Sequence, residues 1–406
     1  MALAGSIRML FQPIVDLQDG HVVGHEALAR GPGGSVLEAP AELFREAALA
    51  GRTAELDWAC RAEAFRCSLS SPRDEGWRLF VNAEPSALNT ACPAPLIDAW
   101  RRAHRELNIV VEVTERFLMR RPADVVRVVG TLRDLGWEIA LDDTGANDAT
   151  VALLPVLTPD IVKLDRLLLK RSLTPHALST LKAVTTYCER SGAALLVEGV
   201  ETESDLARAR ELGARWAQGF LLGRPSELPT YGAEGRAARA ATGRARPRQH
   251  HASWDPRVDD LFRQHAKPDV TLLVESAWLL ERLQGVGQQA ASQPTAGVLL
   301  LFVGVGIPLS ESFLSLLDRL HDVCAVVALE AVEPPGPRKS GLRISPTARP
   351  AAVHDQVAAA YVSPSFSCGL VGRRTDDGRY EVALLTAPDD LSALARALLS
   401  RVPPSP

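Results

Sequence analysis

The most constraining feature of the sequence is a repeated alternation of strand-length apolar runs with helical stretches across residues 7–226. Several runs, such as ALLV at residues 194–197, are continuously apolar, as expected of strands that are covered on both faces. Capped helical patterns separate the runs, for example at residues 53–69, 123–135, 175–190 and 203–212. The expected strands lie at residues 11–17, 22–27, 78–82, 109–113, 138–141, 161–164, 194–197 and 217–221. This series predicts an α/β fold, a TIM-type (β/α)8 barrel of parallel units. An open doubly wound sheet is the alternative, but no GxGxxG motif follows the first strand.

A smaller α/β domain is predicted after a change in composition. Residues 227–253 are rich in Gly, Pro, Ala and Arg and show no periodicity, which is typical of a linker. Beyond them, at residues 254–402, strand and helix patterns resume. Expected strands lie at residues 270–274, 298–303, 325–331, 368–372 and 380–385, and expected helices at residues 277–283, 311–320, 350–360 and 390–399.

Charge and hydropathy exclude several classes of partner. The formal net charge is −4, so no strong field draws the chain to nucleic acid or anionic lipid. The longest apolar run is far shorter than the ~20 residues of a membrane helix, and the N-terminus has no signal-peptide pattern. We therefore expect a soluble, cytoplasmic protein with no DNA partner and no membrane span.

Polar side chains gather where the expected strands of the barrel end. In a parallel barrel the carboxyl ends of all strands open on one face, where active sites form. The residues at or just beyond these ends are Glu26, Asn82, Glu112, Glu115, Asp142, Asp143, Lys163, Asp165, Glu198, Glu201 and Gln218. For any single residue a capping or salt-bridge role is the alternative, but recurrence at strand after strand favours a functional site.

This concentration of carboxylates predicts a metal site, because the like charges would repel one another without cations. Oxygen ligands without His or Cys select Mg²⁺, Mn²⁺ or Ca²⁺. Asp142 and Asp143 are adjacent at a strand end, where both can reach metals. A site for two ions, as used in phosphate-ester hydrolysis, is therefore expected.

Together these motifs resemble the EAL family of cyclic di-GMP phosphodiesterases. The naming tripeptide is Glu26-Ala27-Leu28, and Arg30 completes the EALxR pattern. The other matching segments, in family order, are FQPI (11–14), FVN (80–82), EVTE (112–115), DD (142–143), KLD (163–165), EGVE (198–201) and QGFLLGRP (218–225). The resemblance implies hydrolysis of cyclic di-GMP to linear pGpG by a water that two Mg²⁺ or Mn²⁺ ions activate. Because family members commonly dimerise, a homodimer is a further partner that the resemblance allows.

The resemblance also implies roles for individual residues. The implied ligands are Glu26, Asn82, Glu112 and Asp142 for the first metal, and Asp142, Asp143 and Glu198 for the second. Lys163 would hold the attacking water and, with Glu26 and Glu198, make up the catalytic set. The implied substrate-binding residues are Gln12, Leu28, Arg30, Asp165, Glu201 and Gln218. Glu115 would anchor the loop after the fifth strand.

That loop departs from the family pattern. Members usually read DDFGTGYSSL, whereas residues 142–149 here read DDTGANDA. Weakened support around metal ligands can cost roughly 10–100-fold in metal affinity or activity. An active enzyme is favoured because every ligand is present. The alternatives are a catalytically weak or inactive cyclic di-GMP receptor, and a protein-interaction module with the barrel as scaffold.

The second domain resembles the DICT sensory domain. The segments that carry this resemblance are VLLLFVGVG (298–306), VCAVVALE (323–330), YVSPSFSCGLVGRR (361–374) and YEVALLTAPDDLSALARALLSR (380–401). It implies a sensory domain that responds to a ligand or protein partner and regulates the barrel.

Overall fold

The first part of the chain forms a closed eight-stranded barrel. The structure is a computed structural model that describes residues 7–84, 87, 90–114, 122–144, 148–169, 174–229, 258–265, 271–292, 297–320, 323–332, 334–335, 342–347, 354–364 and 366–402. The strands, in barrel order, are β1 (Arg8–Asp16), β2 (Val22–Arg30), β3 (Arg78–Asn82), β4 (Asn108–Thr114), β5 (Glu138–Thr144), β6 (Ile161–Leu164), β7 (Ala194–Val197) and β8 (Trp216–Gln218). The TIM-type barrel expected from the sequence is confirmed.

The first strand differs from the parallel arrangement that the sequence analysis assumed. β1 runs antiparallel to both of its neighbours, β2 and β8, whereas the pairs from β2 to β8 are parallel. The reason is the short connection from Asp16 to Val22, which turns at Gly20 with a φ of 78°. A parallel connection needs a crossover of a dozen or more residues, so a turn this short produces a hairpin. The hairpin register places Gln12 opposite Glu26.

Side chains of alternate strand positions fill the barrel or face its helices. The interior below the mouth is apolar and includes Ile14, Phe80, Val110, Ile161 and Leu196. The intervening positions pack outward against the surrounding helices. These helices are α1 (Pro40–Leu49), α2 (Thr53–Leu69), the 3-10 helix η1 (Ala94–Leu96), α4 (Ile97–Glu106), α6 (Pro122–Asp134), α7 (Asp148–Leu157), the 3-10 helix η2 (Arg166–Leu169), α8 (Pro175–Ser191) and α9 (Glu203–Glu211).

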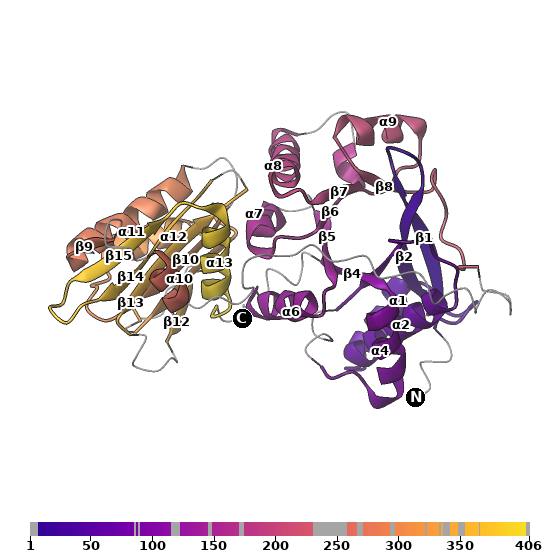
Figure 1. Ribbon diagram of the computed structural model, residues 1–406, viewed down its shortest axis with the longest axis horizontal. Helices are drawn as coiled ribbons and strands as arrows, with labels where there is room; N and C mark the ends of the chain where they lie inside the picture. The colour runs from indigo at the N-terminus through magenta and orange to yellow at the C-terminus, as the bar shows by residue number, and fades with distance from the viewer. Residues whose placement is uncertain are drawn as a thin grey trace.

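A second, smaller domain is built on a seven-stranded sheet with helices on both faces (Figure 1). Its strands are β9 (Leu272–Val274), β10 (Val298–Val303), β11 (Val326–Ala331), β12 (Arg343–Pro346), β13 (Gln356–Val362), β14 (Ser367–Arg374) and β15 (Tyr380–Leu385), in the order β12-β11-β10-β13-β14-β15-β9. One face packs against α11 (Ser276–Ala291) and α12 (Glu311–Leu320), and the other against α10 (Val258–His265) and α13 (Pro388–Leu399). No described helix is long and apolar enough to cross a membrane.

The helix expected at residues 350–360 is wrong. Residues 356–362 form β13, which pairs with β10 on one side and β14 on the other and is buried throughout. The alanines at 358–360 carry high helix propensity, and this local preference misled the sequence reading. In the sheet their small side chains leave room for helices to pack on both faces, so tertiary packing overrides propensity.

Candidate metal and substrate site

Lys163 lies at the centre of a ring of carboxylates in the barrel mouth. Its Nζ is 2.6 Å from Glu112, 2.9 Å from Asp142, 2.8 Å from Glu198 and 3.9 Å from Glu26. These residues stand on four other barrel elements, β2, β4, β5 and the end of β7, and closure of the barrel brings them together. The Lys163 side chain is 1% exposed.

The single ammonium does not balance the charges around it. Burial, reinforced by the like charge of Glu26, raises the pKa of Glu112 well above its ordinary value. Burial likewise raises the pKa of Glu198 to about 7, although Lys163 opposes the shift. Burial would lower the pKa of Lys163, but the carboxylates of Asp142, Glu112 and Glu198 together raise it well above its ordinary value. The lysine therefore stays charged, and the carboxylates have capacity for further protons or cations.

Two amides hold Glu26 in place. Asn82 Nδ2 donates to Glu26 Oε1 at 3.1 Å, and Gln218 Nε2 donates to Glu26 Oε2 at 2.7 Å. Gln218 also reaches Gln12 Oε1 at 3.2 Å, and Gln12 Nε2 donates to the carbonyl of Gly223 at 3.1 Å. Residues from β1, β2, β3 and β8 thus form one continuous polar network beside the carboxylates, with the antiparallel β1 contributing its middle rather than its end.

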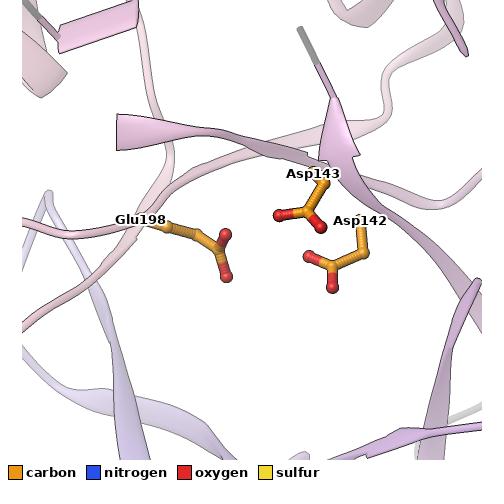
Figure 2. A group of neighbouring side chains, drawn as sticks. All are labelled: Asp142, Asp143 and Glu198. Carbon is orange, nitrogen blue, oxygen red and sulfur yellow. The ribbon is translucent and has the colours of Figure 1, made fainter. Parts of the chain in front are cut away.

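A second group of carboxylates overlaps the ring around Lys163 and adds Asp143 to Asp142 and Glu198. One oxygen each of Asp142, Asp143 and Glu198 lies within 4.8 Å of the other two. Figure 2 shows both aspartates at the end of β5 turned toward Glu198 across an open gap. Adjacent strand residues normally point to opposite faces. Here an irregularity in the β5–β6 register between Leu141 and Thr144, with Asp143 at a φ of 53°, brings both carboxylates to one side.

The residues present fit divalent cations. Glu112 Oε2 is fully buried and has no hydrogen-bond partner among the described residues, a costly condition for a carboxylate oxygen. Among the residues that the structure describes, the charged groups around the gap are carboxylates and one lysine, and no His or Cys joins them. Such a donor set suits hard cations that prefer oxygen, such as Mg²⁺, Mn²⁺ and Ca²⁺.

The remaining sequence-predicted residues lie around this centre rather than in it. Leu28 and Arg30 line a cavity of about 210 Å³ that also touches Asn82. Asp165 accepts the backbone N–H of Leu167 at 2.6 Å and so caps η2. Glu201 is exposed and 3.8 Å from Arg166. The structure therefore gives Asp165 and Glu201 local structural contacts outside the central cluster. Glu115 lies outside the described residues.

The sequence reasoning missed a buried ion pair in the wall of that cavity. Asp57 and Arg61 of α2 pair at 2.6 Å, with side chains 4% and 2% exposed. Asp57 also accepts the backbone N–H of Glu84, two residues after Asn82, at 2.9 Å. The signal that could have revealed the pair is an Asp and an Arg four residues apart within LDWACRA (56–62), which is otherwise apolar.

The closed barrel and the carboxylates at its mouth define a barrel protein with a candidate divalent-metal centre. The family model described as "EAL domain" matches residues 1–225, more than half of the chain. The chain therefore belongs to the EAL family.

Curated relatives and a solved structure each match a little more than half of the chain. "Cyclic di-GMP phosphodiesterase RocR" from Pseudomonas aeruginosa is 29% identical over 231 residues, covering 54% of this chain and 58% of the relative. "Cyclic di-GMP phosphodiesterase NbdA" from the same organism is 30% identical over 232 residues, covering 55% and 29%. The solved "BlrP1 pH 8.0 calcium/cy-diGMP complex" of Klebsiella pneumoniae has a TM-score of 0.49 and 29% identity, covering 56% and 57%. The chain thus spans less than two thirds of each of these proteins.

Proposed function

We propose that the chain hydrolyses cyclic di-GMP to linear pGpG in the mouth of the barrel, with two Mg²⁺ or Mn²⁺ ions. The observation that carries the proposal is the convergence of Glu26, Glu112, Asp142 and Glu198 on one buried lysine, Lys163. Membership of the EAL family and the activities for which RocR and NbdA are named support the choice of substrate.

The proposed ligand sets follow from the two carboxylate groups. Glu26, Asn82, Glu112 and Asp142 would hold one ion, and Asp142, Asp143 and Glu198 the other. Two ions of this kind supply a water of lowered pKa and stabilise negative charge on the attacking and leaving oxygens.

The other polar residues would bind and orient the dinucleotide. Lys163 stays protonated in its ring of carboxylates and would place a fixed positive charge beside the reacting phosphate. Gln12 and Gln218 position Glu26 and offer amides to the substrate. Leu28 and Arg30 line the adjoining cavity, where Arg30 can pair with a phosphate. Asp165 and Glu201 are proposed to contact substrate only at the rim, because each already has a local partner.

The test is incubation of the 406-residue chain with cyclic di-GMP and Mg²⁺ or Mn²⁺, with products separated by ion-exchange chromatography. Linear pGpG is expected with the wild type and not with Glu26→Ala. Turnover by Glu26→Ala equal to that of the wild type would refute the assignment, provided that circular dichroism shows both proteins folded.

A receptor that binds cyclic di-GMP without hydrolysing it is the second candidate. The observation that favours it is the altered loop after Asp143, which lacks the aromatic and the second glycine of the family pattern. Calorimetry separates the two, because a receptor shows binding with no product under either metal. A pull-down partner with no nucleotide binding would instead indicate an interaction module.

We further propose that the second domain is a sensory domain of the DICT type that regulates the barrel. The proposed boundaries are 7–226 for the barrel, 227–253 for the linker and 254–402 for the sensory domain. A homodimer and a cytoplasmic location are also part of this proposal. Of the proposed linker, residues 230–253 lie outside the described residues.

A further inference from the structure

The last helix of the second domain packs against the barrel. α13 lies between its own sheet and the barrel helices α6 and α7 (Figure 1). All residues from Leu391 to Leu399 are buried, although a surface helix normally keeps one polar face. One side of α13 is therefore covered by the sheet and the other by the barrel.

α7 shows the matching property from the barrel side. Val151, Ala152 and Leu153, consecutive residues about 100° apart around the helix axis, are each at most 3% exposed. An outer helix of a barrel usually shows charged residues to solvent, whereas residues 149–157 of α7 carry no charged side chain. α7 touches both α13 and β13 of the second domain. The second domain thus covers an apolar face that the barrel leaves on α7.

Two guanidinium groups bind the carboxyl end of α7, one from each domain. Arg396 of α13 donates from Nη1 to the carbonyl of Val156 at 3.2 Å and is 4% exposed. Arg133 of α6 donates to the carbonyls of Leu157 and Thr158. The last carbonyls of a helix lack partners inside it and form its negative end, so a cation is stabilised there.

The backbone is unfavourable on both sides of α7. Among the described residues, Asp143 and Thr158 are the two non-glycine residues with positive φ, at 53° and 45°. Asp143 precedes α7 and Thr158 follows it, and Thr158 is β-branched, for which this conformation is a genuine outlier. Such conformations persist only where the surrounding structure holds them.

Asp143 and α7 are close in the chain. Thr144 is tied to β6, because its carbonyl accepts the backbone N–H of Asp165 at 3.3 Å. Only residues 145–147 separate it from Asp148, where α7 begins. On its other side, Leu141 pairs with Val162 of β6, so Asp143 lies between that pairing and the short segment that leads through Thr144 to α7.

We propose that Arg396 is a positioning residue for the Asp142–Asp143 metal site. By fixing α7, the docked second domain keeps Asp143 in the conformation that turns its carboxylate toward Glu198, and so raises the affinity of the barrel for divalent cations. This inference rests on the proposed metal site. The second domain supports metal binding in the barrel without contributing a ligand.

The first test compares Arg396→Met, which keeps the bulk but removes the donor, with Arg396→Lys, which keeps a charged donor. Arg379→Met is the matched control, because Arg379 is in the same domain but its side chain is 43% exposed and pairs with Asp377. Two quantities are measured on the full chain without nucleotide: amide exchange in residues 148–157, and Mn²⁺ affinity from the electron paramagnetic resonance signal of free Mn²⁺.

Arg396→Met is expected to speed exchange in α7 and to weaken Mn²⁺ binding about tenfold, the scale seen when support of a metal ligand is removed. Arg396→Lys should recover most of the affinity, and Arg379→Met should match the wild type. Unchanged exchange in α7, faster exchange with unchanged Mn²⁺ affinity, or tighter binding would each overturn the proposal.

A second test needs no variant, in case Arg396→Met fails to fold. Coupling between two sites is reciprocal, so Mn²⁺ bound to the wild type should slow amide exchange in residues 388–399 of α13. No change there at saturating Mn²⁺ would overturn the proposal. A wild type that binds no Mn²⁺ would instead refute the metal site and with it the proposed function. Coupling without pGpG formation would leave this inference standing and favour the receptor.

Discussion

Replacing Lys163 with methionine should destabilise the metal-free protein strongly at pH 8. The ammonium lies 2.6–2.9 Å from three carboxylates, those of Glu112, Asp142 and Glu198, and its side chain is 1% exposed. Methionine fills similar space but leaves these carboxylates without their shared cation. Breaking a buried pair by removing one partner costs about 3–5 kcal/mol. At about 2 °C per kcal/mol for a chain of this size, the expected fall in Tm is roughly 6–10 °C.

Two conditions identify the cause of that fall. At pH 5 the raised pKa values of Glu112 and Glu198 let these carboxylates take up protons, so the difference between Lys163→Met and the wild type should shrink. Saturating Mn²⁺ at pH 8 should recover most of the lost stability, because the metal replaces the missing positive charge. Lys182→Met, on the exposed side of α8, is the control and should melt with the wild type.

The assay is thermal unfolding followed by circular dichroism at pH 5 and pH 8, with and without Mn²⁺. An unchanged Tm for Lys163→Met at pH 8, or a fall of the same size at pH 5, would refute the reasoning. The first result would mean that Lys163 is not needed as a counterion. The second would mean that the loss comes from packing rather than from charge.

Three further predictions concern the surroundings of the site. Burial raises the pKa of Glu198 from an ordinary 4.5 to about 7. The protonated carboxyl therefore stabilises the fold below pH 4.5, and this contribution is lost as the pH rises through 7. In urea unfolding of the metal-free protein, the stability of the wild type relative to Glu198→Gln should fall by up to about 3 kcal/mol between pH 4.5 and pH 8. Arg61→Met leaves Asp57 buried without its cation and should cost about 3–5 kcal/mol, and a cost below 1 kcal/mol would contradict the pairing. Gly219→Ala would place a Cβ 2.1 Å from the carbonyl oxygen of Val200. We expect this clash to lower the Tm and, by displacing Gln218, to abolish cyclic di-GMP binding. A cyclic di-GMP affinity equal to that of the wild type, measured by calorimetry, would contradict this prediction.

The sequence allowed the barrel and most of the cluster to be predicted because both depend on local signals. Short apolar runs bounded by polar residues gave β3 and β6 their observed bounds at residues 78–82 and 161–164. The convergence of Glu26, Glu112, Asp142 and Glu198 then follows from barrel closure alone. The antiparallel direction of β1 could also have been predicted, because the five residues between β1 and β2 are too few for a parallel crossover.

Features that depend on distant parts of the chain were not predicted. Nothing near Lys163 in the sequence shows that one ammonium contacts several carboxylates, because its partners come from other strands. The contact between Arg396 and Val156 joins residues 240 positions apart. Its nearest local signal is the uncharged segment 149–157, which indicates a helix covered on both sides. For the alanines of β13 the local signal was present but misleading, because their helix propensity was overridden by packing in the sheet.

The repulsion among the carboxylates that makes the mouth a candidate metal site also gives a physical reason for the proposed influence of a distant helix. Carboxylates held close together favour separation when no cation is bound, and Lys163 and the rigidity of the backbone oppose this separation. Asp142 and Asp143 depend on an irregular strand end with an unfavourable φ, whereas Glu26 is fixed by two amides from neighbouring strands. The carboxylate group of Asp142, Asp143 and Glu198 is therefore more easily deformed than the group around Glu26. α7 begins five residues after Asp143, and α13 packs against α7. If Arg396 positions this group as proposed, a change that loosens the second domain should weaken it first and leave the network around Glu26 intact.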